Sequence, residues 1–297
     1  MGLLRTGGPR RSPGRSPGRC TLPGTLPRVA FIALITGASS GIGEATARRL
    51  AREPGARLVL VARRQERLEA LAGELGDVTV IALDLTEQGA PQAVADVVAR
   101  EHGELHLLVN NAGAAWRGRF AETGWANVER HMKLNFEAPV RLTEALLPLL
   151  RATAGKQAGA SPPISIVNVG STASRVSRPD SGAYSASKFA LAGWSDALHA
   201  EERPHGVHVG LVLPGFVRTE GFPAAELIAR AATRWLVSSP EVVAEAIVEA
   251  GPGGKAERYV PRYYWIGAAL RLLAPALVRR ATAGGALTTA TKADDAW

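Results

Sequence analysis

The strongest constraint on the fold is an alternation, from Val29 onward, between short apolar runs and longer amphipathic stretches. Seven runs rich in Val, Ile and Leu have the length of β-strands: Ala30–Ile35, Arg57–Val61, Val78–Leu83, Leu105–Val109, Ile164–Val169, Val207–Leu213 and the short Arg258–Val260. Apolar residues at nearly every position of a strand indicate burial on both faces, which is typical of parallel sheets. The alternation therefore predicts βαβ units stacked into one parallel sheet.

Amphipathic stretches of helical length separate these runs. They cover Gly43–Arg52, Gln65–Gly73, Ala90–Glu101, Trp125–Leu150, Tyr184–Glu202 and Pro240–Ala250, and a surface loop is expected at Ala154–Pro163. Crossovers between parallel strands are almost always right-handed. We therefore predict a single α/β domain with a doubly wound parallel sheet of about seven strands, which binds ligands at the carboxyl ends of the strands.

Both ends of the chain are expected to lie outside this domain, which we place at residues 28–261. Residues 1–27 hold five arginines, no acidic residue and the only cysteine, Cys20. This pattern predicts either a disordered basic extension or a translation start placed too early. Without those five arginines the formal charge of +8 falls to about +3, which is ordinary for a soluble enzyme, so no nucleic-acid partner is expected.

Cysteine content and apolar run lengths bear on location. One cysteine allows no intrachain disulfide, and Pro, Gly and Arg interrupt every apolar run before Arg28, so no secretory signal is expected. The apolar stretch Tyr263–Val278 is shorter than the ~20 residues of a membrane span, and Arg271 and Pro275 interrupt it. We predict a cytoplasmic protein whose residues 262–297 form an amphipathic extension.

A glycine-rich turn directly follows the first predicted strand. It reads Thr36-Gly37-Ala38-Ser39-Ser40-Gly41-Ile42-Gly43. Glycines let the backbone approach a pyrophosphate, whose charge is attracted by the free N–H groups and dipole of the following helix. The spacing G-x-x-x-G-x-G departs from the commoner G-x-G-x-x-G fingerprint. Its position favours dinucleotide binding; the alternative is a tight turn without a ligand.

The end of the second predicted strand distinguishes the two nicotinamide cofactors. An acidic residue there would hydrogen-bond the ribose hydroxyls of NAD. This chain instead has Ala62 followed by Arg63 and Arg64. The planar guanidinium of Arg63 suits the oxygens of a 2′-phosphate, so we predict a preference for NADP(H). The alternative is that both arginines are solvated at the start of a helix.

Tyr184 and Lys188 are four residues apart in a predicted helix, so their side chains share one face. A phenol loses its proton near pH ~10, and a nearby ammonium stabilises the phenolate and lowers that value. Ser171 follows the strand Ile164–Val169, and its hydroxyl could hold a substrate oxygen. In isolation a Tyr-x-x-x-Lys pair is more often a surface pair than a site.

Further motifs accompany this pair, in a characteristic order. They are Asp84-Leu85, Asn110-Asn111-Ala112-Gly113, Asn135 and Pro214-Gly215-Phe216-Val217-Arg218-Thr219. Together with the glycine-rich turn, Ser171 and Tyr184-Ser185-Ala186-Ser187-Lys188, they resemble the short-chain dehydrogenase/reductase family. The resemblance covers about residues 29–260 and implies a Rossmann-type sheet.

The resemblance implies a catalytic tetrad of Asn135, Ser171, Tyr184 and Lys188. In the family Tyr is the acid/base, Ser positions the substrate oxygen, Lys binds the nicotinamide ribose and lowers the Tyr pKa, and Asn holds a water. Further roles are implied for the cofactor: Gly37, Ser39, Ser40, Gly41, Ile42 and Gly43 at the phosphates, Arg63 at the 2′-phosphate, Asp84 and Leu85 at the adenine, Asn111, Ala112 and Gly113 at the adenosine ribose, and Pro214, Val217 and Thr219 at the nicotinamide carboxamide.

Partners are also implied by the resemblance. Residues Thr219–Trp235 correspond to a substrate-covering lid, and apolar side chains in and beside it suggest a hydrophobic substrate: Phe216, Phe222, Leu227 and Trp235. Family members associate through long helices, so a homodimer or homotetramer is expected. The tail Tyr259–Arg280 either lies on a membrane, covers the pocket or packs on the protein. The six histidines lack acidic or cysteine partners at metal spacing, so no metal is expected.

These observations predict an NADPH-dependent oxidoreductase that interconverts a carbonyl and an alcohol, with Tyr184 exchanging the proton. Two alternatives remain from the sequence. One is a 3-oxoacyl thioester reductase of lipid metabolism, which acyl-carrier substrates would reveal. The other is a non-catalytic nucleotide-binding protein, which would have little need of an intact set of Asn135, Ser171, Tyr184 and Lys188.

Overall fold

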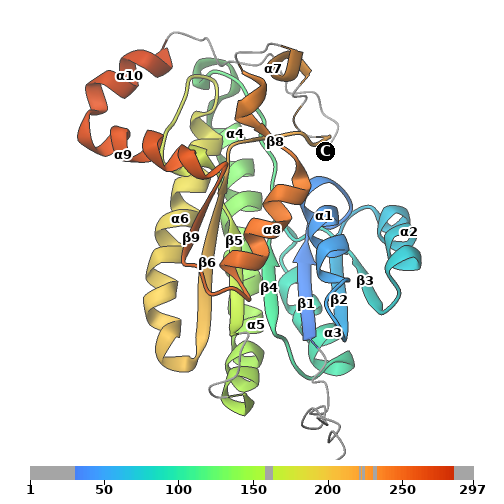
Figure 1. Ribbon diagram of the computed structural model, residues 1–297. Coiled ribbons are helices and arrows are strands. Elements are labelled where there is room, and N and C mark those ends of the chain that lie inside the picture. Colours follow the sequence, from blue (N-terminus) through green and yellow to red (C-terminus); the bar gives the residue numbers. More distant parts are fainter. Residues whose placement is uncertain (1–30, 158–162, 221, 223–224, 230–232, 284–297) are drawn as a thin grey trace, which may run out of the picture.

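A computed structural model describes residues 31–157, 163–220, 222, 225–229 and 233–283. Seven parallel strands form its main sheet (Figure 1). Their spatial order is β3-β2-β1-β4-β5-β6-β9, with bounds β1 Phe31–Thr36, β2 Ala56–Ala62, β3 Val78–Ala82, β4 Leu107–Asn110, β5 Ile164–Val169, β6 Val207–Pro214 and β9 Glu257–Val260. The predicted doubly wound parallel sheet is confirmed. The order reverses between β1 and β4, which opens a crevice at the carboxyl ends of these strands.

Strand boundaries agree closely with the sequence prediction. The strand β5 matches Ile164–Val169, and all six of its residues are buried. By contrast β4 begins two residues later than predicted, at Leu107. Leu105 is buried, but its backbone N–H donates to the Thr153 hydroxyl at 3.1 Å, outside the ladder of the sheet. An apolar pattern thus reports burial more directly than it reports strand pairing.

Helices cover both faces of the sheet. On one face lie α1 (Gly41–Leu50), α2 (Gln65–Leu75) and α8 (Pro240–Ala250), which contribute Leu50, Leu68 and Ile247 to one buried cluster. On the other lie α3 (Ala90–Glu101), α5 (Ala138–Lys156) and α6 (Gly182–Glu202), which contribute Val98, Leu142 and Leu198 to a second. The three-layer core fixes the ends of the strands, on which the site is built.

The predicted helix Trp125–Leu150 is longer and less regular than expected. It is observed as α4 (Phe120–Met132), a π-helical turn (Lys133–Glu137) and α5, in unbroken succession. The π turn widens the helix at Asn135, a position where such turns often serve function. The loop expected at Ala154–Pro163 was partly wrong, because α5 continues to Lys156; residues 158–162 lie outside the described part.

Several smaller elements gather at the carboxyl end of the sheet. A two-stranded parallel sheet, β7 (Phe216–Val217) with β8 (Val237–Ser238), ties together the base of the predicted lid, which includes α7 (Ala225–Ala229). The helices α9 (Trp265–Leu273) and α10 (Pro275–Ala283) lie at the same end (Figure 1). No helix in the described residues is both long and apolar enough to span a bilayer. The predicted extension at residues 1–27 and the segment 284–297 lie outside the described residues.

Candidate active site

A cavity of about 730 Å³ opens at the carboxyl end of the sheet. Of the site residues predicted from the sequence, all but Gly43 and Asn135 line it. Those two contact residues that do line it: Gly43 packs against Gly37, and Asn135 hydrogen-bonds Ala114. The structure therefore brings together two sets of residues that are more than a hundred positions apart in the chain, the glycine-rich turn and the Tyr184–Lys188 pair.

The glycine-rich turn takes a shape that side chains would prevent. Gly37 and Gly41 have φ angles of +66° and +57°, in the left-handed region that favours glycine. A Cβ on Gly43 would lie 2.2 Å from the carbonyl oxygen of Gly37, so the first turn of α1 can pack against β1 only without a side chain there. The backbone N–H groups at the start of α1 thus form one wall of the cavity.

The segment after β4 forms the neighbouring wall. Asn111 joins the ends of β4 and β1, because its side-chain amide donates to the Thr36 carbonyl oxygen at 2.8 Å. Gly113 passes so close to the π turn that a Cβ would lie 2.9 Å from Asn135 Oδ1 and 3.4 Å from Lys188 Nζ. Gly113 therefore allows the segment after β4 to pack closely against Asn135 and Lys188.

Asn135 is fully buried in the π turn and bonds the loop after β4 in both directions. Its Oδ1 accepts from the backbone N–H of Ala114 at 3.0 Å, and its Nδ2 donates to the Ala114 carbonyl at 2.9 Å. The same Nδ2 lies 3.1 Å from the Ser187 hydroxyl on α6. Asn135 thereby fixes the loop against the helix that carries Tyr184 and Lys188.

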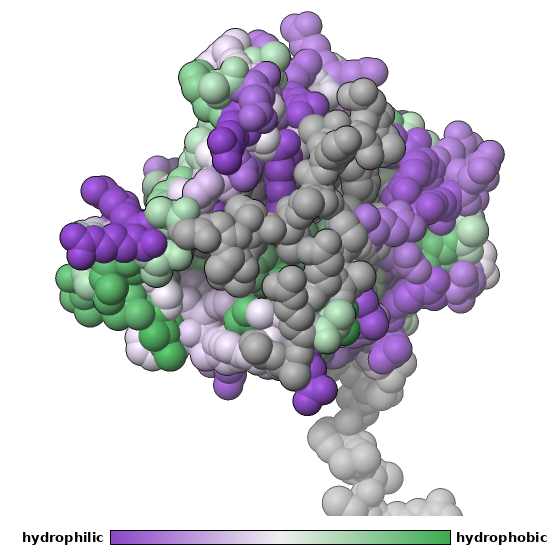
Figure 2. Space-filling view, turned by 90° about the horizontal axis from the view of Figure 1, so that it is seen from above, coloured by the Kyte–Doolittle hydropathy of each residue, from purple (hydrophilic) through white to green (hydrophobic). Residues whose placement is uncertain are grey.

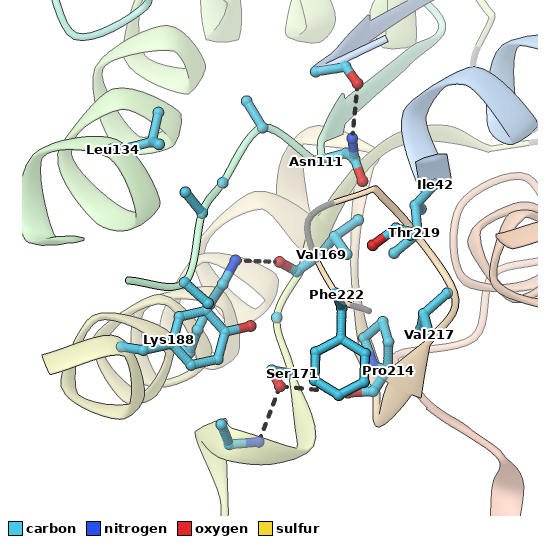
Figure 3. A pocket seen from close by; sticks show the side chains of 18 of the residues that line it. Ile42, Asn111, Leu134, Val169, Ser171, Lys188, Pro214, Val217, Thr219 and Phe222 are labelled. Atoms are coloured by element: carbon cyan, nitrogen blue, oxygen red, sulfur yellow. Dashed lines mark hydrogen bonds between the residues drawn. The ribbon is translucent and has the colours of Figure 1, made fainter. Parts of the chain in front are cut away.

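Lys188 projects from α6 into the cavity, as Figure 3 shows, and its Nζ donates to the Val169 carbonyl at 2.8 Å. Val169 ends β5, so this bond ties α6 to the sheet edge. Burial lowers the pKa of Lys188 to about 8, because the ammonium loses hydration. At neutral pH the group therefore still carries its proton.

Tyr184 and Ser171 meet at the other side of Lys188. Burial raises the pKa of Tyr184 above its ordinary value, while a hydrogen bond with Ser171 and the positive charges of Arg117 and Arg178 oppose that rise. From the sequence we expected Lys188 to supply the positive charge that lowers the pKa of Tyr184. In the structure Arg117 and Arg178, which lie in loops, have this effect. The Ser171 hydroxyl accepts from the Ala173 backbone N–H at 3.1 Å, which holds it at the cavity wall.

The predicted 2′-phosphate region holds more arginine than expected. Arg63 is half exposed and lies 3.7 Å from Asp84, whose carboxylate accepts from the backbone and hydroxyl of Thr86. Arg64 reaches back to the glycine-rich turn and donates to the hydroxyls of Ser39 and Ser40 at 3.2 and 2.7 Å. Arg64 therefore cannot be a merely solvated residue at the start of α2.

Comparison with known proteins agrees with this geometry. The family model described as short chain dehydrogenase matches residues 31–226. The chain belongs to the short-chain dehydrogenase/reductase family. The matched region includes every predicted site residue, from the glycine-rich turn to Thr219.

Individual relatives of this dehydrogenase/reductase family show moderate identity. Dehydrogenase/reductase SDR family member 7B of Danio rerio is 34% identical over 198 residues, which cover 63% of this chain and 61% of that protein. The match thus spans about three fifths of the relative's length. Oxidoreductase UcpA of Salmonella typhimurium is 36% identical over 204 residues, which cover 67% of this chain and 72% of that protein.

Solved structures of family members share the fold. A short-chain dehydrogenase from Streptomyces avermitilis has a TM-score of 0.69 at 30% identity, over 84% of this chain and 96% of that one. A short-chain dehydrogenase/reductase from Burkholderia phymatum, solved in complex with NAD, has a TM-score of 0.70 at 26% identity, over 84% and 95%.

The lid contributes only part of what the family resemblance implied. Phe216 and Phe222 line the cavity and stack on one another with ring centroids 5.4 Å apart. Leu227 is instead buried away from the cavity, and Trp235 is largely exposed. Residues of α9 and α10 that sequence reasoning did not name individually complete its roof: Gly267, Ala268, Leu270, Val278 and Thr282. The tail therefore covers the cavity, one of its three expected roles.

Metal ligands do not gather anywhere in the part of the chain that the structure describes: no three His, Cys, Asp or Glu side chains lie close enough to hold an ion. His131 illustrates how a histidine is used instead. It is buried beside Tyr184, where its Nε2 accepts from the Trp116 backbone N–H at 3.0 Å. Its role is to shape the loop that follows β4.

Proposed function

We propose that the chain is an NADPH-dependent oxidoreductase that interconverts a carbonyl and an alcohol, with Tyr184 exchanging the proton. The observation that carries this proposal is the convergence of Tyr184, Ser171 and Lys188 on one wall of a cavity whose other wall is the glycine-rich turn. Hydroxyl, phenol and ammonium groups are the set needed to hold a substrate oxygen and move a proton to it.

The shape and charge of the cavity fit a nicotinamide dinucleotide. Close backbone packing at Gly43 and Gly113 leaves a cradle free of side chains, and helix α1 begins at its edge. The Burkholderia relative was solved with NAD, which supports this class of cofactor. We assign the adenine to Asp84 and Leu85, the adenosine ribose to Asn111–Gly113, and the nicotinamide carboxamide to Pro214, Val217 and Thr219.

The bound cofactor would supply or accept the hydride at the substrate carbon. Ser171 holds the substrate oxygen, and Tyr184 gives it a proton during reduction or removes one during oxidation. Lys188 is protonated at neutral pH, so it can donate to the cofactor ribose and stabilise a phenolate. Asn135 holds the loop after β4 in place through its two hydrogen bonds to the backbone of Ala114.

Turnover of a panel of aldehydes, ketones and alcohols, followed through NADPH absorbance, tests this function. We expect reduction of at least one carbonyl class, with a rate that is steady near neutral pH and falls as the pH rises through about 8. The sign follows from Lys188, whose lowered pKa makes it lose its positive charge there, while the raised pKa of Tyr184 keeps the phenol protonated. Failure to turn over any compound contradicts the function, and a flat alkaline profile contradicts the role of Lys188.

The remaining parts of the proposal concern location and assembly. The single cysteine favours a cytoplasmic protein, and the long helices α5 and α6 are the surfaces through which we propose a homodimer or homotetramer forms. Peripheral contact with a membrane is proposed through α9 and α10. Leu272 and Leu273 are each 83% exposed there. Arg271 precedes them in α9, Arg279 and Arg280 follow in α10, and Figure 2 shows hydrophobic and hydrophilic surface side by side at its left edge.

Vesicle flotation tests the membrane contact. Because exposed leucines would insert between lipids while arginines attract acidic headgroups, we expect the full chain to float with phosphatidylserine-containing vesicles and to detach as salt rises. The Leu272→Ser/Leu273→Ser variant should stay at the bottom of the gradient. Val242→Ser, which changes an exposed apolar residue on α8, is the matched control. Equal flotation of all three proteins would refute the contact.

A further inference from the structure

Two arginines stand beside the catalytic tyrosine, and the proposed chemistry does not use them. Arg117 lies in the loop between β4 and α4, and Arg178 lies in the loop between β5 and α6. Both line the cavity, and the charges of both act on Tyr184. Their position next to the reacting group makes them part of the surface that a substrate must meet.

Both arginines are held in place by their own loops. The N–H of Trp116, one residue before Arg117, donates to His131 at 3.0 Å, and the N–H of Gly118, one residue after it, donates to the Asp180 carbonyl at 2.9 Å. The Arg178 carbonyl accepts from the Ser181 hydroxyl at 2.9 Å, directly before α6 begins. The backbone bond from Gly118 to Asp180 therefore joins the two loops at one side of the cavity.

The guanidinium groups stack on the two phenylalanines of the cavity wall. Arg117 lies 5.1 Å from the ring centroid of Phe222, and Arg178 lies 4.8 Å from that of Phe216. The two rings stack on each other, so the four side chains form one layered group. Stacking holds a guanidinium by its face and directs its N–H donors outward in its plane.

Basic residues outnumber acidic ones among the described residues that line the cavity. Among the described residues that line it, Asp84 is the only acid, and it follows β3 at the far edge of the sheet from Tyr184. Basic residues line both ends of the cavity: Arg63 and Arg64 lie near Asp84, and Arg117 and Arg178 lie beside Tyr184. Burial lowers the pKa of Arg178, and the charge of nearby Arg117 lowers it further. Two cations close together in a partly buried site favour an anion beside them.

We propose that Arg117 and Arg178 form a subsite for a carboxylate on the substrate, so that the enzyme acts on carbonyl compounds that carry an acidic group beside an apolar body. The inference rests on the proposed carbonyl chemistry and refines its substrate class. A guanidinium binds a carboxylate through paired hydrogen bonds, while Phe216 and Phe222 provide the apolar surface. Both arginines also have contacts within the chain, which a substrate carboxylate would share or replace.

The first test compares para-carboxybenzaldehyde with its methyl ester in the full chain, followed by NADPH consumption. Because hydrogen bonds to charged groups contribute about 10- to 100-fold in affinity, we expect kcat/KM for the acid to exceed that for the ester by about tenfold or more. In Arg117→Gln/Arg178→Gln the ratio of acid to ester should fall to near one, and each single variant should lose part of it. Because both compounds react at Tyr184, a change in the reactivity of that residue alters both rates alike and leaves their ratio unchanged.

Arg119→Gln is the matched control, because Arg119 lies in the same loop, is exposed and pairs with Asp180 outside the cavity. Its acid-to-ester ratio should equal that of the wild type. If the wild type reduces the ester but does not prefer the acid, or if the preference survives in the double variant, the subsite is overturned while the carbonyl chemistry stands.

A binding experiment decides the inference without turnover. Calorimetry with benzoate should show about tenfold weaker binding to the double variant than to the wild type, while Arg119→Gln binds as the wild type does. Circular dichroism and the melting temperature establish that each variant is folded, and the single variants replace the double one if it is not. Equal benzoate affinity in folded variants overturns the subsite, even if no carbonyl compound is reduced.

Discussion

Replacing Tyr184 by phenylalanine is expected to lower the rate of carbonyl reduction by about 10²–10⁴-fold, the usual contribution of a positioned general acid. The substitution removes only the hydroxyl, so the edge-to-face contact of the ring with His131, at 6.1 Å between centroids, is retained. Because Lys188 and the glycine-rich turn are unchanged, affinity for NADPH should stay close to that of the wild type. Steady-state kinetics measures the first effect, and fluorescence titration with NADPH measures the second.

Tyr263→Phe provides the matched control for this variant. It makes the same chemical change at a tyrosine outside the cavity, whose hydroxyl donates to the Trp235 carbonyl at 2.6 Å. We expect it to retain wild-type turnover. A Tyr184→Phe enzyme that works at nearly the wild-type rate on a true substrate would show that another group supplies the proton. Equal loss of activity and of NADPH binding would point to a structural role for the ring instead.

The parallel sheet could be predicted because strands that are buried on both faces are apolar at most positions. Every residue of β5 is buried and four of the six are Ile or Val, while the buried Ser165 and Asn168 have hydrogen-bond partners. The site residues were predicted through the family resemblance, and the order of the elements explains how two of them can meet. Ser171 lies two residues after β5, and α6 begins as the crossover helix to β6, which places Tyr184 at the carboxyl edge of the sheet.

The π turn at Lys133–Glu137 could not be predicted in the same way. Helical periodicity averages over several turns, and one wider turn hardly changes it. What stabilises this turn is tertiary: Asn135 bonds both backbone groups of Ala114, in a loop that follows a different strand. The sequence could mark Asn135 through a family resemblance, but it could not show how the backbone brings that side chain inward.

Charged side chains in loops were the other feature that sequence reasoning missed. Arg117 and Arg178 stand 61 positions apart in loops without periodicity, and a backbone hydrogen bond from Gly118 to Asp180 joins those loops. Their only signal was position, since each follows a strand whose carboxyl end borders the site. The direction of a long side chain is decided by stacking on Phe216 and Phe222, which only the folded structure reveals.

Arg64 shows the same limit near the proposed cofactor. Position after β2 singled out Arg63, and the structure adds Arg64, which bonds the hydroxyls of Ser39 and Ser40. Arg64 also donates to Glu220 at 3.2 Å, and Arg67 donates to the same carboxylate at 2.7 Å. Hydrogen bonds from these two arginines lower the pKa of Glu220, so the lid and α2 are joined by a charged contact at neutral pH.

Cofactor preference is the second effect that we expect to be large. Arg63→Asp should change the ratio of kcat/KM for NADPH over NADH by about 10²–10³-fold in favour of NADH, because it removes a charged hydrogen bond and places a carboxylate against a 2′-phosphate. The new carboxylate can also accept from the ribose hydroxyls of NAD, as acids at this position do. Kinetics with both cofactors measures the ratio, and calorimetry with NADP⁺ and NAD⁺ measures binding without turnover.

Arg67→Gln is the control that separates this effect from a general loss of positive charge on α2. Arg67 pairs with Glu220 but does not line the cavity, so its removal should leave the cofactor ratio close to that of the wild type. If Arg63→Asp leaves the ratio unchanged, then Arg63 does not meet the 2′-phosphate. If Arg64→Gln shifts the ratio in that case, the phosphate lies between the glycine-rich turn and Arg64, because that guanidinium already bonds Ser39 and Ser40 there.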